Sequence, residues 1–114
     1  MCGIAGIFCL DGGTVDPGLL AQMSERIRHR GPDGSGTHID GPVGLAHRRL
    51  AIIDLTDAAK QPMPNEDGTL WLVFNGEIYN YRELKAELEK RGHRFSTNSD
   101  TEVIVHQYEE DGED

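Results

Sequence analysis

The sequence predicts a mixed α+β fold in one domain. Its segments are expected in the order strands, helix, strands, helix, strand, helix, which suits a layered α+β fold better than a regular parallel sheet. The length of 114 residues is near the common size of a single core. A hydrophobic share of 37% and a charged share of 27% are typical of a soluble globular protein.

The first strand and the first helix are expected before residue 31. Residues 2–10, CGIAGIFCL, are apolar and interrupted by glycines, which mark places where another backbone or a ligand comes close in a strand. In the helix that follows, Asp16 is the expected cap, Pro17 takes the first position and Gly31 ends it. One face of this helix carries Leu20, Met23 and Ile27.

The middle of the chain alternates loops and strands. Residues 30–36, RGPDGSG, consist of turn residues and predict a loop, as do residues 61–68, QPMPNEDG. Residues 41–55 are expected to supply one or two strands. Residues 69–81 are apolar on both sides of Asn-Gly, which favours a β-hairpin, but the continuous run LWLVF favours a strand buried on both faces.

The last third predicts two helices around a short strand. Asn80 with Glu83 resembles a capping box that opens a helix over residues 81–92. Residues 93–98, HRFSTN, are expected to form a short strand. A second pair of the same kind, Ser99 with Glu102, opens the last helix over residues 100–112.

Charge and cysteine content exclude several classes of function. A net charge of −9 argues against nucleic-acid binding, which relies on clustered Lys and Arg. No apolar run approaches the roughly 18 residues of a membrane span, and no basic segment of a signal peptide follows Met1. Cys2 and Cys9 on one strand would lie roughly 20 Å or more apart on opposite faces, so we expect free thiols and a cytoplasmic location.

Cys2 is a candidate nucleophile because of its place in the chain. If Met1 is removed, Cys2 carries both a thiol with a pKa of about 8.5 and an α-amine with a pKa of about 8. The amine is then a base that activates the sulfur. The alternative is that Cys2 is a small, partly apolar residue without chemistry, as free cysteines often are.

Asn75 and Gly76 are candidates for stabilising an oxyanion. Acyl transfer through a thiolate needs donors aimed at the developing negative charge, and a side-chain amide beside a glycine N–H supplies two. The alternative is that Asn-Gly is simply a type I′ hairpin turn.

Arg49 and Asp100 are candidates for holding the amino-acid end of a substrate. A guanidinium binds a carboxylate and a carboxylate binds an ammonium group. The alternatives are an edge-strand charge for Arg49 and a first-turn acid of a helix for Asp100. Metal-ligand spacing is not evident among the histidines, so we expect no metal; these are residues 29, 38, 47, 93 and 106.

Several motifs in one order resemble a known family. They are MCGIAGIF, RHRGPDGSG, LAHRRLAIIDL, QPM, FNGEIYNYRELKAELEKRGHRF and SDTEVI. Together they resemble the glutaminase domain of asparagine synthetases, which are class II glutamine amidotransferases. The resemblance implies an N-terminal-nucleophile hydrolase with an αββα sandwich, two packed antiparallel sheets between helical layers. It also implies hydrolysis of L-glutamine to glutamate and ammonia.

The resemblance also assigns roles to individual residues. Cys2, after loss of Met1, would attack the side-chain amide carbon of glutamine, and Asn75 with Gly76 would form the oxyanion hole. Arg49 would hold the α-carboxylate and Asp100 the α-ammonium group. The pocket would be completed by backbone around Leu50, Ile52 and Glu77.

The family pattern extends further than these 114 residues. In the family the glutaminase domain continues for roughly as many residues again, and a C-terminal synthetase domain binds ATP and magnesium. We therefore expect residues 1–114 to be the N-terminal part of a glutaminase domain, without a cofactor of its own and without the synthetase domain. The sequence leaves open whether the protein forms a homodimer. The alternative functions are a catalytically silent glutamine-binding or interaction module and an amidotransferase for an acceptor other than aspartate.

Overall fold

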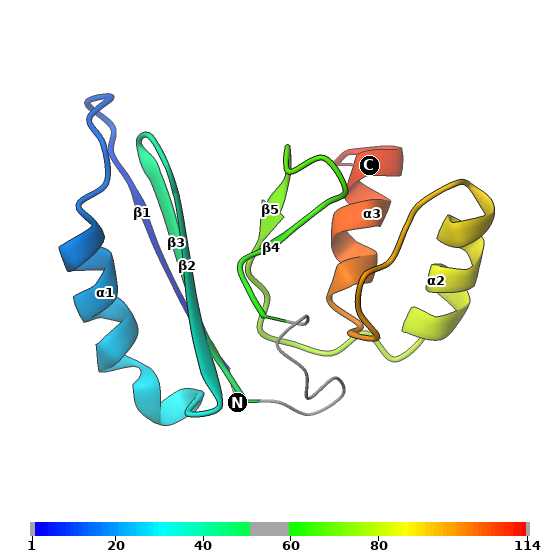
Figure 1. Cartoon of the computed structure of the whole chain (residues 1–114), viewed down its shortest axis with the longest axis horizontal. Helices are drawn as coiled ribbons and strands as arrows, with labels where there is room; N and C mark the ends of the chain where they lie inside the picture. The colour runs from blue at the N-terminus through cyan, green and yellow to red at the C-terminus, as the bar shows by residue number, and fades with distance from the viewer. Residues whose placement is uncertain (1, 51–59, 114) are drawn as a thin grey trace. The chain divides into compact units, whose positions relative to one another are not determined.

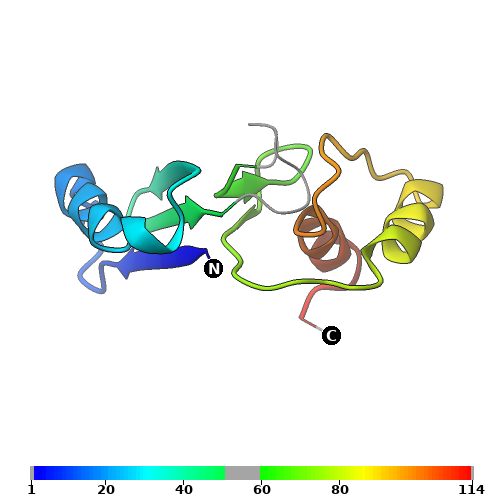
Figure 2. The same cartoon turned by 90° about the horizontal axis from the view of Figure 1, so that it is seen from below.

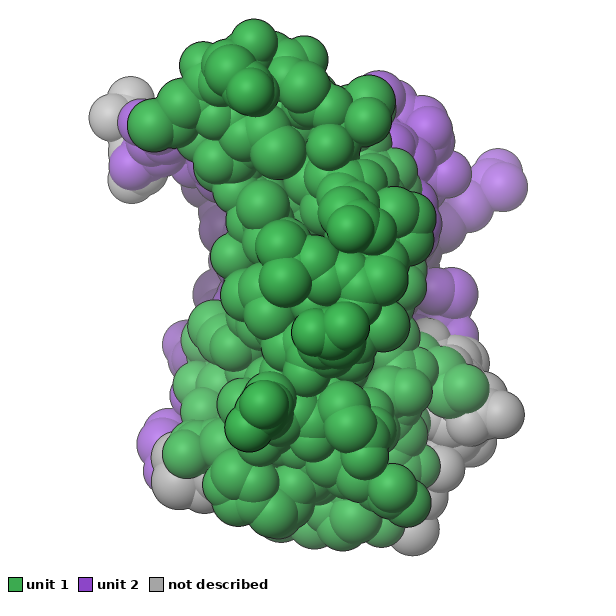
Figure 3. All heavy atoms as spheres, turned by 90° about the vertical axis from the view of Figure 1, so that its left-hand side faces the viewer, with its two compact units in different colours: residues 1–51, 60–62, 73–75 green, residues 52–59, 63–72, 76–114 purple. Residues whose placement is uncertain are grey.

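The computed structural model describes residues 2–50 and 60–113 and has the α+β character expected from the sequence. Within it the chain forms two compact units, coloured separately in Figure 3. Unit 1 comprises residues 2–50, 60–62 and 73–75, and unit 2 comprises residues 63–72 and 76–113. Each unit contains one antiparallel sheet. Met1 and Ile52, which the sequence analysis singled out, lie outside the described residues.

Unit 1 is built on a three-stranded sheet in the order β1-β3-β2. Its strands are β1 (Gly3–Phe8), β2 (Gly34–Asp40) and β3 (Val43–Arg49). Both pairings are antiparallel, so β3 forms hydrogen bonds along both of its edges. The expected loop over residues 30–36 is therefore shorter, because Gly34 already belongs to β2. The ladder with β3 compensates for the weak strand preference of glycine and serine.

Helix α1 (Pro17–Arg26) covers one face of this sheet, as Figures 1 and 2 show. Its start is as predicted, since the Asp16 side chain accepts a hydrogen bond of 2.9 Å from the Gly18 N–H. The α-helix ends at Arg26, before the expected Gly31, and a short 3-10 turn follows over residues 28–30. The core of unit 1 lies under α1 and contains Val15, Leu20 and Ala46, with partly buried Ala5, Ile7, Cys9 and Ile39 around them.

The hairpin of unit 2 is shifted from the position that the sequence indicated. Strands β4 (Met63–Pro64) and β5 (Trp71–Leu72) pair with each other. The turn between them is closed by Asn65, whose side-chain oxygen accepts from the Leu70 N–H at 3.1 Å. The hairpin therefore does not turn at Asn75 and Gly76, and residues 70–74 are not an interior strand.

Helices α2 (Tyr81–Lys90) and α3 (Glu102–Asp111) pack side by side in unit 2 (Figure 1). The last residue of helix α2 is Lys90, and Gly92 is the terminating glycine as predicted, because it has a φ of 97° and the His93 N–H returns to the Leu88 carbonyl at 3.1 Å. The start differs from the expected capping box, since the Asn80 side chain makes no cap hydrogen bond. No helix in the described part of the chain has the length and apolar character that a membrane crossing requires.

The expected strand over residues 93–98 is not formed. Instead, the N–H groups of Ser96 and Thr97 donate to the Glu102 carboxylate, at 3.0 and 3.2 Å. Glu102 is only 2% exposed. Its carboxylate binds this upstream loop and not the N–H of Ser99, which the capping box would require. The Ser99 hydroxyl accepts from the Thr101 N–H at 3.2 Å, so the start of α3 is organised by side chains, although not as the predicted capping box.

Candidate functional site

The thiol of Cys2 lies against the end of strand β3. The register pairs Gly3 with Arg48, so Cys2 and Arg49 follow at the same end of the two strands. The Cys2 Sγ accepts a hydrogen bond from the Leu50 N–H at 3.3 Å and lies 3.7 Å from the Leu50 carbonyl oxygen, to which it donates. The thiol is half-buried, and its position is set by the backbone of Leu50.

A short segment after α1 holds this end of the sheet. The Arg30 Nε donates to the Cys2 carbonyl at 3.1 Å, and the Asp33 N–H donates to the Arg49 carbonyl at 3.0 Å. Between them, Gly31 lies so close to β3 that a Cβ would be 2.3 Å from the carbonyl carbon of Arg48. Only glycine fits there, so residues 30–33 are fixed against the strand end that carries Arg49.

The two adjacent arginines of β3 have different environments. Arg48 donates to the Ser24 hydroxyl at 2.9 Å and pairs with Glu25 at 2.9 Å, which binds it to α1. Successive strand residues point to opposite faces, so Arg49 points to the face away from α1. Residues directly opposite each other in a sheet share a face, which puts Cys2 on the side of Arg49. Arg49 is thus the arginine that shares a face with Cys2, and its role in binding a substrate stays a prediction.

His47 connects this face to the segment that carries Asn75. Its Nε2 donates to the Phe74 carbonyl at 3.2 Å, while the Phe74 N–H donates to the Gln61 side-chain oxygen at 2.6 Å. Burial of the ring lowers the pKa of His47, and the charge of Arg49 adds to the shift, although the Phe74 carbonyl opposes it. His47 therefore acts as a neutral donor to Phe74, the residue before Asn75. Sequence reasoning missed this role, because the contact with Phe74 forms only in the folded chain.

The predicted site residues fall into two groups. Cys2, Arg49, Leu50 and Asn75 belong to unit 1, whereas Gly76, Glu77 and Asp100 belong to unit 2. Asp100 is 6% exposed, and its Oδ2 accepts a hydrogen bond of 2.8 Å from the Ile78 N–H. It therefore holds the backbone next to Glu77 in unit 2.

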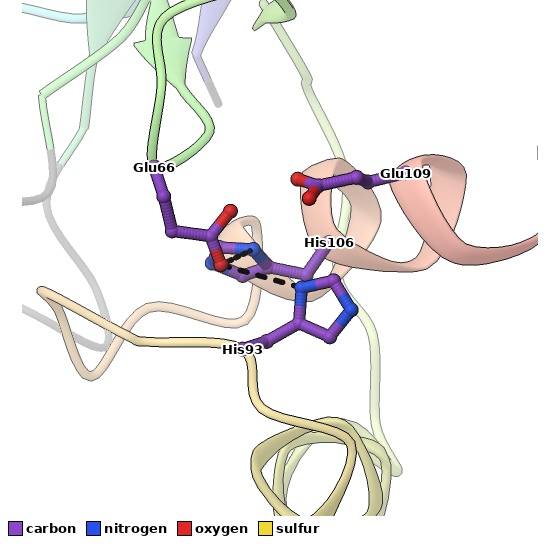
Figure 4. A group of neighbouring side chains, drawn as sticks. All are labelled: Glu66, His93, His106 and Glu109. Carbon is purple, nitrogen blue, oxygen red and sulfur yellow. Dashed lines mark hydrogen bonds and ion pairs between the residues drawn. The ribbon is translucent and has the colours of Figure 1, made fainter.

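A separate cluster of titratable side chains lies in unit 2, namely Glu66, His93, His106 and Glu109 (Figure 4). Burial opposes ionisation of Glu66, but its own N–H and that of Arg94 lower its pKa to about 2. The hydrogen bond to Glu110 raises the pKa of His93. Among the described residues, this is the group whose composition could hold a metal ion.

Comparison with known proteins gives a consistent result over the whole chain. The profile of the family described as "Glutamine amidotransferase domain" matches residues 1–114. The chain is 50% identical to asparagine synthetase [glutamine-hydrolyzing] 2 of Bacillus subtilis (strain 168), over 98% of this chain and 15% of that protein. It is also 50% identical to asparagine synthetase [glutamine-hydrolyzing] of Zea mays, over 100% of this chain and 19% of that protein. The chain thus spans less than a fifth of the length of these relatives.

Proposed function

This chain belongs to the glutamine amidotransferase domain family, and from that premise we propose that it hydrolyses L-glutamine to glutamate and ammonia through the thiolate of Cys2. The observation that carries the proposal is the family match over all 114 residues. The names of the relatives, which describe them as glutamine-hydrolyzing, support it.

The first step is the attack of sulfur on the side-chain amide. After removal of Met1, the α-amine of Cys2 takes the thiol proton, and the thiolate forms a bond to the amide carbon of glutamine. Negative charge develops on the amide oxygen. The Asn75 side-chain amide and the Gly76 N–H donate hydrogen bonds to it.

The second step releases ammonia and then glutamate. The α-ammonium group of Cys2 gives its proton to the leaving nitrogen, the C–N bond breaks and a thioester to Cys2 remains. Water then attacks the thioester carbon while the α-amine accepts a proton. The C–S bond breaks, the thiol is restored and glutamate leaves.

The amino-acid end of glutamine is held by charged groups. Arg49 binds the α-carboxylate with paired N–H donors, and Asp100 binds the α-ammonium group. The separate binding of Arg48 to α1 supports the assignment to Arg49 rather than to its neighbour. The pocket is completed by backbone at Leu50, Ile52 and Glu77.

The proposed acceptor of the ammonia concerns a protein longer than these 114 residues. The relatives are named asparagine synthetases, so we propose that a synthetase domain outside these 114 residues uses ATP and magnesium to make asparagine from aspartate. The glutamine step in this chain needs no cofactor. Two free thiols, Cys2 and Cys9, support a cytoplasmic location. A measurement of the protein's molar mass in solution shows whether it forms a homodimer.

Ammonia release by two cysteine variants tests the proposal. Cys2→Ala is expected to abolish glutamine-dependent ammonia release, because the nucleophile is lost. Cys9→Ala is the matched control, since Cys9 lies at the far end of β1 beside the core and is expected to keep activity. Ammonia release that survives Cys2→Ala, or that both variants lose equally, would contradict the proposal.

A further inference from the structure

Four side chains from separate segments of unit 2 converge on one point. Glu66 lies in the turn between β4 and β5, His93 lies in the loop after α2, and His106 and Glu109 are one turn apart on α3. One ligand atom of each lies within 4.8 Å of all the others. Figure 4 shows the two carboxylates and the two rings directed toward one another.

The buried ring of His106 gives an independent indication of a ligand. His106 is 2% exposed, yet neither of its ring nitrogens forms a hydrogen bond with a described residue. Its Nδ1 is 3.0 Å from Glu66 Oε1, close enough for an ion pair but not aligned for a hydrogen bond. Two ligands of one ion approach each other in this way, because both lone pairs point at the ion. The Nε2 of His106 is 3.7 Å from Glu102 Oε2, which is beyond hydrogen-bond distance. A buried polar atom that forms no hydrogen bond is unfavourable unless a ligand satisfies it.

Two of the distances within the cluster match those around a small tetrahedral ion. Ligands about 2.0–2.1 Å from zinc are separated by about 3.3 Å along the edge of a tetrahedron. Glu66 Oε1 is 3.0 Å from the Nδ1 of His106 and 3.3 Å from the Nδ1 of His93. Glu66 is thus already at ligand spacing from each of the two imidazoles, and the remaining ligand atoms lie within 4.8 Å of one another.

A second set of contacts orients these side chains. The Nε2 of His93 is 2.8 Å from a Glu110 oxygen, the carboxylate–histidine arrangement found behind metal-bound imidazoles. The Asn65 side-chain amide donates to Glu109 at 3.0 Å, and the Arg94 N–H donates to Glu66 at 3.1 Å. A hydrogen bond from outside the cluster therefore sets the orientation of His93, Glu109 and Glu66.

We propose that Glu66, His93, His106 and Glu109 bind one divalent transition-metal ion of the zinc class. Two imidazoles and two carboxylates match the nitrogen and oxygen preferences of zinc, and the two negative charges balance the ion. The cluster borders an open hollow of about 460 Å³ lined in part by Glu66, His93 and Glu109, which gives the ion a way in. The ion would join the β4–β5 turn, the end of α2 and α3, so its role is structural.

The binding of zinc and cobalt to the purified chain tests this site. One zinc ion per chain is expected, together with a rise in the melting temperature on zinc addition. Cobalt is expected to give the intense visible absorption of a tetrahedral site. His93→Ala and Glu109→Gln are expected to weaken zinc binding by more than roughly 10- to 100-fold, the penalty for losing a partner behind a ligand. Glu110→Gln, which alters such a partner, is expected to cost roughly 10-fold.

The matched control is His29→Ala, which removes an exposed histidine of unit 1 and is expected to leave zinc affinity unchanged. Glu109 is exposed, so Glu109→Gln keeps the test readable if His93→Ala fails to fold. Cobalt without tetrahedral absorption, or zinc binding that His29→Ala weakens as much as Glu109→Gln does, would overturn the proposal.

Discussion

Unit 1 and unit 2 bury their polar groups in different ways. Unit 1 pairs its backbone in a three-stranded ladder and buries Val15, Leu20 and Ala46 beneath α1. Unit 2 has only the short β4–β5 pair, and its loops are bound by buried side chains such as Asp100 and Glu102. Backbone pairing survives most single substitutions, whereas a loop held by one carboxylate does not. The stability of unit 2 therefore depends more on individual polar residues.

The largest expected effect separates the proposed catalytic roles of the two units. Asn75→Ala in unit 1 should slow ammonia release by about two to three orders of magnitude with little change in KM, because an oxyanion donor is lost. Asp100→Asn in unit 2 keeps an oxygen for the Ile78 N–H but loses the charge, so it should mainly raise KM for glutamine. Steady-state kinetics distinguish the two. If Asn75→Ala changes only KM, Asn75 is not a donor of the oxyanion hole.

The core of unit 1 provides the next largest effect. Leu20 is 0% exposed beneath the sheet, so Leu20→Ala should lower the free energy of unfolding by about 3 kcal/mol. Its neighbour Leu19 is 50% exposed, and Leu19→Ala should change the free energy of unfolding by about 0.5 kcal/mol or less. Denaturant titration measures both. Equal losses would mean that α1 does not cover the sheet with the face described.

Glu102 tests the dependence of unit 2 on single side chains. Glu102→Ala leaves the N–H groups of Ser96 and Thr97 without their acceptor and should lower the free energy of unfolding by about 2 kcal/mol. Hydrogen exchange of those two amides should accelerate as well. Glu89→Ala, on the exposed side of α2, is the control and should have little effect. If amide exchange at Ser96 and Thr97 is the same in both variants, Glu102 does not hold this loop.

The pH dependence of stability tests the polar group buried in unit 1. The folded pKa of His47 is lowered, so below about pH 6.5 the unfolded chain binds a proton that the folded chain does not. The contribution of His47 to stability should fall as the pH decreases through that range, by at most about 1.4 kcal/mol per pH unit, and level off below the folded pKa. The raised pKa of His93 contributes with the opposite sign, so the comparison with His47→Gln isolates the part that comes from His47. Urea titrations between about pH 7.5 and 5.5 measure this slope. The slope should shrink in His47→Gln, which keeps an amide donor for Phe74, and an unchanged slope would exclude His47 as its source.

Local signals in the sequence were sufficient where one residue acts on its own neighbours. The Asp16 cap with Pro17 and the Gly92 terminus were predicted from short patterns, and the structure confirms both. Strand β2 was missed because its glycines and serine carry no strand signal of their own, and its pairing with β3 forms it. The strand expected over residues 93–98 failed for a similar reason, since Glu102 takes its backbone donors.

The candidate sites show the same limit. Cys2 was recognisable because it directly follows Met1, and Arg49 because its guanidinium suits a carboxylate. That Arg48 binds α1 and leaves Arg49 on the face of Cys2 follows only from the strand register. The proposed metal ligands had no spacing signal, because Glu66, His93 and His106 come from separate segments that meet only in the folded chain.

The most direct test of the central claim compares glutamine hydrolysis by protein with Met1 removed and protein that retains it. Both forms carry the same Cys2 thiol, but an amide replaces the α-amine when Met1 is retained. If the α-amine is the base, the processed form should release ammonia and the retained form should be nearly inactive, with intact mass confirming the state of each sample. Equal rates in the two forms would contradict the role proposed for the amino terminus of Cys2.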